Sequence, residues 1–231
     1  VSAFDFISFG YRLRWPLSLI ITSESLRLYN STFNFLVRTK LAGHAVNDIW
    51  KYLKNLLHVS REGDKTQGSE WTDMLVHLRQ QVNHFLTSLQ GHIEMQLLHN
   101  VWCKFMEAIH HDGKDLLELK EIHELYLKDA IHVCFLSEEM DSVRNCINEI
   151  MQCVLDLSAC LKIIGKEESG NPSLQNEKVQ LEIRQALRQF QSIIWKLFQI
   201  AEKGHNHFSL SQFWTCLNFN GYFDSICLNH S

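Results

Sequence analysis

The stretch WTDMLVHLRQQVNHFLTSLQGHIEMQLLHNVWCKFMEAI, from Trp71 to Ile109, decides the fold class of this 231-residue chain. Its apolar residues recur every three or four positions, the spacing that places side chains on one face of an α-helix. These residues are Trp71, Leu75, Leu78, Val82, Phe85, Leu89, Ile93, Leu97, Val101, Phe105 and Ile109. The pattern predicts one uninterrupted amphipathic helix of about 40 residues, whereas an average helix has roughly 11 or 12.

Helical spacing continues along most of the chain. It is interrupted at residues 60–69 and 165–175, whose glycine, proline and charged residues are typical of loops. Further helices are predicted at residues 23–58, 115–135, 138–164 and 176–203, with a short one from near Ser209. Ser23 is expected to cap the first of these through its hydroxyl. We therefore predict an all-α fold, an elongated multi-helix bundle with long helices, forming one domain over residues 1–231.

The first 15 residues have a different spacing. Apolar side chains alternate there, imperfectly, with polar ones: Phe4, Phe6, Ile7, Phe9, Tyr11, Leu13 and Trp15. Alternation favours an extended strand, and Pro16 stops it. Because a lone strand leaves backbone groups without partners, we expect one short N-terminal strand whose partner lies upstream. We interpret the chain as the C-terminal piece of a longer protein.

Composition limits the classes of partner. Hydrophobic residues make up 45% of the chain, which is ordinary for a globular protein, and the net charge is −4 with a pI near 6.4. A general nucleic-acid binder would be basic, and no apolar run approaches the roughly 20 residues that cross a bilayer. We therefore expect neither nucleic acid nor a membrane as partner. Cys146, Cys153 and Cys160 recur every seven residues, too far apart on a helix for disulfides, so we expect buried thiols in a reducing cytosol.

Histidine is abundant, with 13 residues, but its spacing does not indicate a metal site. His77 and His84 are seven residues apart, as are His92 and His99, whereas a helix holds a metal through histidines four apart, as in H-E-x-x-H. The sequence also has no P-loop, no G-x-G-x-x-G and no G-x-S-x-G. We expect no metal, no cofactor and no catalytic residues, and hence a binding protein.

Charge is distributed unevenly. Up to residue 58 there are seven Lys or Arg and three acidic residues, whereas from Asp115 to Glu149 there are nine acidic residues and three basic ones. Such a gradient is typical either of solvated helix faces or of a surface that meets a partner protein. Two other classes stay open: an all-α ligand-binding receptor-type domain, which needs an enclosed cavity of several hundred Å³, and a coiled-coil tether.

Four motifs, in order along the chain, resemble one family. They are Tyr11 with Trp15-Pro16-Leu17, Tyr29-Asn30 and Phe35-Leu36-x-Arg38-x-Lys40; LRQQVNHFLTSLQGHI from Leu78 to Ile93; DLLELKEIHELYL from Asp115 to Leu127; and the closing LNFNGYF. Together they resemble the C-terminal region of the gamma-tubulin complex proteins. The chain departs from the family pattern at Leu41-Ala42-Gly43, where a basic pair is frequent, and at Val82, His92 and Asn218.

This resemblance implies a helical scaffold, not an enzyme, that binds gamma-tubulin. It implies that other gamma-tubulin complex proteins bind through the N-terminal region of the longer protein. The assembled ring supports microtubule nucleation in the cytoplasm, at the cytoskeleton's centrosomes or spindle poles. The residues that we expect to contact gamma-tubulin are Arg38, Lys40 and His44 on the basic first helix and Phe219, Tyr222 and Phe223 in the aromatic tail. For Phe219 and Tyr222, closure of the core is the alternative.

Overall fold

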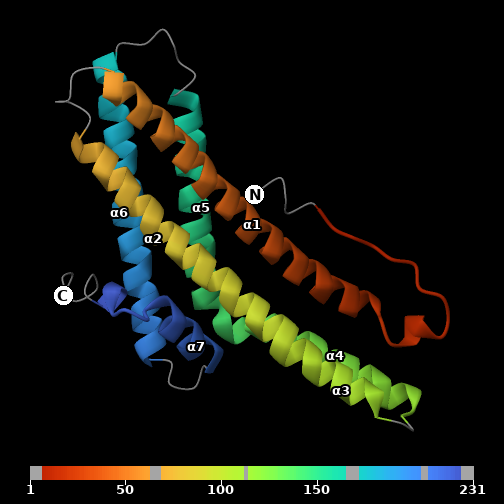
Figure 1. Ribbon diagram of the computed structural model, residues 1–231. Coiled ribbons are helices and arrows are strands. Elements are labelled where there is room, and N and C mark those ends of the chain that lie inside the picture. The colour runs from red at the N-terminus through yellow and green to blue at the C-terminus, as the bar shows by residue number, and fades with distance from the viewer. Residues whose placement is uncertain (1–6, 63–68, 112–113, 165–171, 204–207, 225–231) are drawn as a thin grey trace. The chain divides into compact units, whose positions relative to one another are not determined.

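The structure, a computed structural model, describes residues 7–62, 69–111, 114–164, 172–203 and 208–224. Every regular element in these ranges is helical, so the predicted all-α class is confirmed. The α-helices are α1 (Ser23–Glu62), α2 (Ser69–Glu94), α3 (Trp102–His110), α4 (Leu116–Val133), α5 (Asp141–Ile164), α6 (Pro172–Lys203) and α7 (Phe208–Leu217) (Figure 1). Shorter turns are the 3-10 helices η2 (Leu17–Leu19) and η4 (Glu138–Met140) and the π-helix η3 (Met95–Val101). None of the described helices is long and apolar enough to span a membrane.

The predicted helix boundaries agree with the structure to within a few residues. Both predicted loops lie partly outside the described residues, at 63–68 and 165–171, and the flanking helices extend to Glu62 and from Pro172. The helix α1 begins at Ser23 as predicted, but the capping hydroxyl belongs to Thr22. The Ser25 N–H donates to the Thr22 hydroxyl oxygen at 3.2 Å, and the Thr22 N–H donates to the Ser25 hydroxyl oxygen at 3.3 Å. This reciprocal pair satisfies two backbone donors at the start of the helix.

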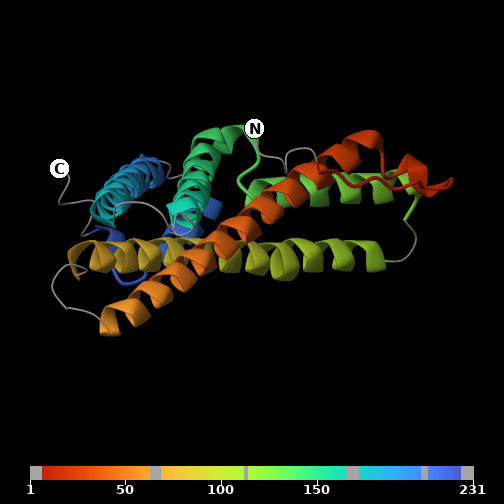
Figure 2. The ribbon, with the colours of Figure 1, turned by 90° about the horizontal axis from the view of Figure 1, so that it is seen from above.

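The short N-terminal strand is not found where the structure describes the chain. From residue 7 to residue 14 the segment lies alongside α1 without forming a strand (Figures 1 and 2). The side-chain amide of Asn30 takes the place of a neighbouring strand: its oxygen accepts from the Phe9 N–H at 2.9 Å, and its nitrogen donates to the Phe9 carbonyl at 3.0 Å. The Phe9 ring packs edge-on against Phe33, with 5.5 Å between centroids. Residues 1–6 of the predicted strand lie outside the described residues.

The long helix predicted from Trp71 to Ile109 is interrupted by the π-helix η3, so the expectation of one unbroken α-helix is wrong. The sequence contains the physical reason. From Phe85 to Ile109 the stripe advances by four residues at every step, whereas an α-helix turns once every 3.6 residues. The stripe would therefore drift around a regular helix. Because π-helical hydrogen bonds span five residues, η3 turns less per residue and offsets part of this drift.

The chain divides into two compact units, which we describe separately. Unit 1 comprises Val1–Arg38 and Leu89–Arg144, and unit 2 comprises Thr39–Ser88 and Asn145–Ser231. In unit 1, η3 and α3 pack against α4. Asp115 caps α4 in a reciprocal capping box with Glu118. A small core of buried residues joins these elements, consisting of Val101, Ala130 and Val133 with Leu97 and Tyr126 packed against it.

An aromatic cluster surrounds His123 of α4 in unit 1. The His123 Nε2 lies 3.0 Å from the Tyr29 hydroxyl, while its Nδ1 is buried and has no hydrogen-bond partner in the part of the chain that the structure describes. The ring is 4% exposed and lies close to Phe105 and Tyr126. Burial lowers the pKa of His123 and raises the pKa of Tyr29 to about 12. Both groups are therefore held in their neutral forms.

A second buried histidine of unit 1, His92, lies against the end of α4. Phe135 follows α4 with a φ of 57° and is stabilised there by a turn in which the Leu136 N–H donates to the Ile131 carbonyl at 2.9 Å. The fully buried Phe135 ring stacks on His92, with 5.7 Å between centroids. Burial lowers the pKa of His92 to about 4.

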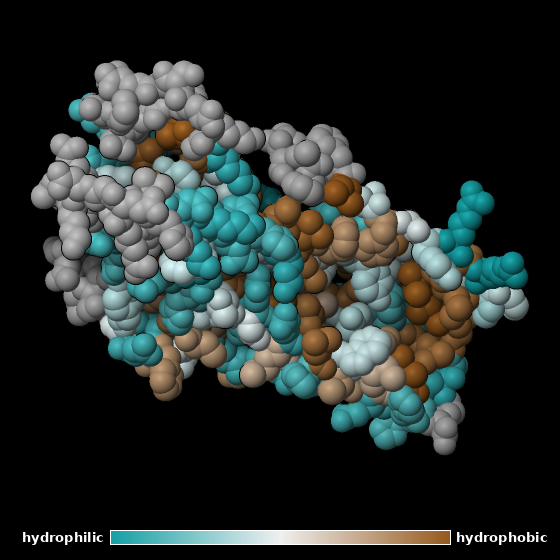
Figure 3. Space-filling model, turned by 45° about the horizontal axis from the view of Figure 1, so that its top comes forward, coloured by the Kyte–Doolittle hydropathy of each residue, from teal (hydrophilic) through white to brown (hydrophobic). Residues whose placement is uncertain are grey.

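Apolar side chains are also exposed on unit 1. They include Ile7, Phe9, Tyr11, Trp15, Leu17 and Leu19 near the start of the chain, Met95, Leu98, Trp102 and Ile109 along η3 and α3, and Leu116, Leu117 and Leu125 on α4. Tyr11 and Trp15 have exposed fractions of 77% and 78%. Figure 3 shows apolar residues, coloured brown, at the right of the view. The surface of unit 1 therefore includes many apolar side chains, although α4 in the same unit has more acidic than basic residues.

The core of unit 2 is formed by α5, α6, α7 and the adjoining parts of α1 and α2. The Phe85 ring of α2 packs edge-on against Phe190 at 6.5 Å and Phe213 at 5.8 Å. Cys146 and Cys153 are buried free thiols, as expected, and Cys160 is half-buried. Packing of this kind holds the middle of α2 against the helix α7, and the candidate site lies next to this contact.

Candidate functional site

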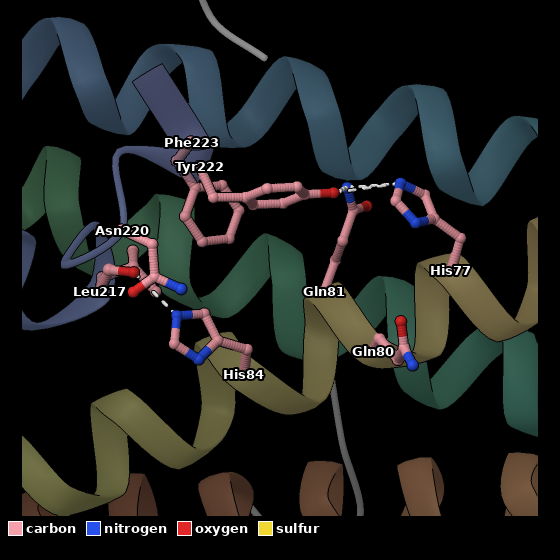
Figure 4. Close-up of a pocket in the computed structure, with 8 residues that line it drawn as sticks. All are labelled: His77, Gln80, Gln81, His84, Leu217, Asn220, Tyr222 and Phe223. Carbon is pink, nitrogen blue, oxygen red and sulfur yellow. Dashed lines mark hydrogen bonds between the residues drawn. The ribbon is translucent and has the colours of Figure 1, made fainter. Parts of the chain in front are cut away.

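A surface pocket of about 260 Å³ lies in unit 2 where α2 faces the turn that follows α7 (Figure 4). We call residues 217–223 the C-terminal turn. Polar side chains form most of the wall, with one leucine backbone and one phenylalanine ring between them. The lining residues are His77, Gln80, Gln81 and His84 of α2 and Leu217, Asn220, Tyr222 and Phe223 of the C-terminal turn.

One side of the pocket is a three-membered hydrogen-bond network. The Tyr222 hydroxyl oxygen accepts from the Gln81 amide nitrogen at 2.8 Å and lies 3.1 Å from the His77 Nε2. The Gln81 amide nitrogen is itself 3.1 Å from the His77 Nε2. His77 and Tyr222 are exposed, whereas Gln81 is 4% exposed and its Oε1 has no hydrogen-bond partner among the described residues. The network therefore joins the surface to a buried amide that still has an unused acceptor.

The opposite side is built on His84. Its Nε2 lies 2.8 Å from the Leu217 carbonyl oxygen. A carbonyl only accepts, so this nitrogen is the protonated one, and neutral His84 keeps an acceptor at Nδ1. The His84 ring stacks on the fully buried Phe223, with 5.9 Å between centroids and 11° between planes. His84 thus fixes the C-terminal turn at two points, one polar and one apolar.

The C-terminal turn owes its shape to Asn218 and Gly221. The Asn218 side-chain oxygen accepts from the Phe223 N–H at 3.0 Å, and the Gly221 N–H donates to the Asn218 carbonyl at 2.9 Å. Gly221 has a φ of +65°, a conformation that costs residues with a Cβ atom about 1 kcal/mol or more. The turn brings Asn220, Tyr222 and Phe223 to the pocket while Phe219 stays 86% exposed.

The chemistry of this pocket is dominated by hydrogen-bonding side chains. None of the described residues that line it is Asp, Glu, Lys or Arg. The described part of the chain also contains no group of three His, Cys, Asp or Glu residues placed to hold a metal ion. At about 260 Å³ and open to solvent, the pocket is smaller than the several hundred Å³ of enclosed cavity that a ligand-binding receptor domain needs.

The structure brings only part of the predicted contact set together. Tyr222 and Phe223 line the pocket and Phe219 lies next to it in the chain. Of the three, Phe223 is fully buried and supports the turn from inside, whereas Phe219 has the exposure that a contact residue requires.

The basic residues predicted on the first helix are located on α1 and do not line the pocket. Lys40 and His44 are both exposed, and being four residues apart they share one side of the helix. Arg38 is half-buried, and two residues along an α-helix correspond to a rotation of about 200°. Arg38 and Lys40 therefore point to different sides of α1.

Sequence reasoning considered His77 and His84 only as metal ligands and did not single out Gln80, Gln81 or Asn220. The sequence did contain a pattern that indicates this polar site. His77, Gln81 and His84 have the spacing of one helix face, and they form a polar face beside the apolar stripe of α2. What the sequence could not show is which segment covers that face.

Comparison with known proteins decides the family. A sequence model described as "Gamma tubulin complex component C-terminal" matches residues 1–223. The chain belongs to this family. Gamma-tubulin complex component 6 of Homo sapiens is 28% identical over 216 residues, and component 6 of Mus musculus is 30% identical over 219 residues. Both alignments cover 92% of this chain and 12% of the relative, so the chain spans about one eighth of these gamma-tubulin complex components.

Other relatives carry names of the same kind. Gamma-tubulin complex component 3 of Arabidopsis thaliana is 32% identical over 160 residues, covering 65% of this chain and 19% of the relative. The spindle pole body component 98 of Dictyostelium discoideum is 21% identical over 197 residues, covering 84% and 24%. The family consists of structural components of a cytoskeletal complex.

Proposed function

We propose that this chain is the gamma-tubulin-binding region of a scaffold subunit of the gamma-tubulin ring complex. One observation carries the proposal, the match of residues 1–223 to the C-terminal region of gamma-tubulin complex components. The all-helical architecture supports it, because closely packed helices deform little and can hold a large partner in a fixed orientation. In this role the chain performs no catalysis.

The longer protein would join other gamma-tubulin complex proteins through regions outside this chain. Assembled side by side, such subunits would present successive gamma-tubulin molecules and so support microtubule nucleation. The relatives include gamma-tubulin complex components and a spindle pole body component, which supports a location in the cytoplasm at centrosomes or spindle poles.

Two surfaces are proposed for the contact. The first is the exposed side of α1 with Lys40 and His44, and Arg38 further around the helix. The second is the C-terminal turn, where Phe219 is 86% exposed and Tyr222 is 38% exposed, with the buried Phe223 as their support. Stable protein interfaces bury about 1,600 Å² and depend on a few aromatic or arginine anchors, and these residues supply that chemistry.

Binding of the purified 231-residue chain to gamma-tubulin and to α/β-tubulin, measured side by side by biolayer interferometry, tests the proposal. We expect gamma-tubulin to bind and α/β-tubulin not to bind at the same concentration. The Lys40→Glu change should weaken capture about tenfold without lowering the melting temperature, because it reverses an exposed charge. Lys178→Glu, a charge reversal at an exposed residue of α6, is the matched control. Equal binding of both tubulins, or of neither, would contradict the proposal.

A further inference from the structure

We propose that the pocket beside the C-terminal turn receives one uncharged, hydrogen-bonding side chain of gamma-tubulin, with Phe219 as the aromatic anchor next to it. This inference rests on the proposed function and adds where the partner inserts and what chemistry it inserts. The occupant belongs to the class of Asn, Gln, Ser, Thr and Tyr side chains. Four features of the pocket lead to it: its size, its lack of charge, its unused acceptor and its fixed walls.

The size of the pocket suits one side chain. Pockets that hold cofactors or drug-sized molecules have volumes of about 300–1,000 Å³, and this pocket has about 260 Å³. Since a water molecule occupies about 30 Å³ of liquid, the space corresponds to about nine water molecules, enough for one side chain. Protein interfaces fill pockets of this kind with single anchor residues from the partner.

The lining favours an uncharged occupant. A carboxylate or an ammonium group would leave water for a wall without Asp, Glu, Lys or Arg among its described residues, and burying an unpaired charge is costly. The wall does offer both hydrogen-bond donors and hydrogen-bond acceptors. The exposed carboxamides of Gln80 and Asn220 can each donate and accept, and His84 keeps an acceptor at Nδ1.

The buried Gln81 amide adds a direct requirement for a donor. Its nitrogen is engaged with Tyr222 and His77, but its Oε1 is buried without a partner. An unsatisfied buried acceptor is unfavourable, and a donor from an incoming side chain would relieve it after a small movement of the amide. An occupant with an N–H or O–H group therefore fits better than an apolar one.

The walls of the pocket are already fixed before any partner arrives. His84 holds the Leu217 carbonyl and stacks on Phe223, and the Asn218 side chain holds the backbone of Phe223. Because little further ordering is needed on binding, more of the interaction energy appears as affinity.

Phe219 supplies the apolar part of the interface. It precedes Asn220 of the pocket wall and is 86% exposed, an unusual state for a phenylalanine. The chain offers a matched control in Phe208, which is 74% exposed at the other end of the ten-residue helix α7. The two rings have the same chemistry and similar exposure, but only Phe219 adjoins the pocket.

The test is the affinity of the full 231-residue chain for purified gamma-tubulin, measured for the wild type and three variants. Phe219→Ala removes the proposed anchor, Asn220→Trp obstructs the pocket, and Phe208→Ala is the control. We expect at least tenfold weaker binding for the first two and less than twofold change for the third. All three changed residues are exposed, so circular dichroism melting should be unchanged and should verify folding.

The outcomes separate the two proposals. If the wild type binds and both Phe219→Ala and Asn220→Trp bind equally well, the inference is overturned while the proposed function stands. If only Phe219→Ala weakens binding, the pocket is not where the partner inserts, and that part of the inference is overturned. If the wild type does not bind gamma-tubulin, the proposed function fails and the inference fails with it.

Discussion

Each unit of the molecule contains a tyrosine hydroxyl next to a histidine Nε2. In unit 1 the pair is Tyr29 with His123, at 3.0 Å, and in unit 2 it is Tyr222 with His77, at 3.1 Å. The distances are almost the same, but His123 is buried in an aromatic cluster whereas His77 is exposed at a pocket. The comparison teaches that burial, and not the chemistry of the pair, distinguishes a structural contact from one that is available to a partner.

The electrostatic consequences differ accordingly. Burial lowers the pKa of His123 and raises that of Tyr29 to about 12, so neither group changes its charge near neutral pH. The buried pair contributes to stability through packing and one hydrogen bond. The pair at the pocket keeps contact with solvent and shares a third polar group, Gln81.

The strongest test of this difference removes each histidine. His123→Ala should lower the free energy of unfolding by about 3 kcal/mol, because it leaves a cavity among aromatic rings and an unpaired Tyr29 hydroxyl. His77→Ala should cost less than about 1 kcal/mol, since the ring is exposed. Urea denaturation of both variants gives the two values. Similar losses would show that the two pairs have the same role.

A pH experiment examines the second buried histidine of unit 1. The pKa of His92 falls from 6.5 to about 4 in the folded chain, because burial disfavours the charged ring. The unfolded chain therefore takes up a proton first as the pH falls, and the stability associated with neutral His92 is present above pH 6.5 and is lost towards pH 4.

Between pH 7 and pH 5 the wild type should consequently lose about 1 to 2 kcal/mol more stability than the His92→Gln variant. Denaturation midpoints at both pH values, for both proteins, provide the measurement. All other titrating groups are common to the two proteins, so the difference isolates His92. An equal loss in both would mean that His92 is not held neutral by burial.

The smallest expected effect separates stability from binding. Tyr29→Phe should cost about 1 kcal/mol of stability, because the His123 Nε2 loses its hydrogen bond to the Tyr29 hydroxyl inside the cluster. Tyr222→Phe should change stability by about 0.5 kcal/mol or less but weaken gamma-tubulin binding about fivefold. Thermal melting and interferometry on the same samples check both. The comparison would not hold if Tyr29→Phe were the variant that lost binding at unchanged stability.

The helices were predictable from sequence because apolar spacing reports directly on which face of a helix is buried. The limits of the prediction have physical causes. Thr22 and Ser23 are both hydroxyl residues, so sequence alone could not decide which of them caps α1. The alternation before Pro16 resembles a strand because both a strand and an extended segment lying against a helix present every second side chain to the protein.

The candidate site was predicted only in part. An aromatic tail in the sequence indicates a contact region, but it does not reveal that Phe223 is buried while Phe219 is exposed, since that depends on the turn at Gly221. His77 and Gln81 meet Tyr222 across a separation of more than 140 residues. Contacts of such long range follow from packing, which local patterns do not encode.

The winding of the π-helix η3 determines which way the side chains of α3, the next helix, face. If the seven residues of η3 were wound as a regular α-helix, each would contribute about 100° of rotation, which is more than a residue of a π-helix contributes. The Phe105 ring, 4.5 Å from Tyr126 between centroids, would then turn away from the cluster around His123. A single-residue deletion between Met95 and Val101 would offset this extra rotation, so the length of the segment and its π-helical winding together set the direction of the Phe105 side chain.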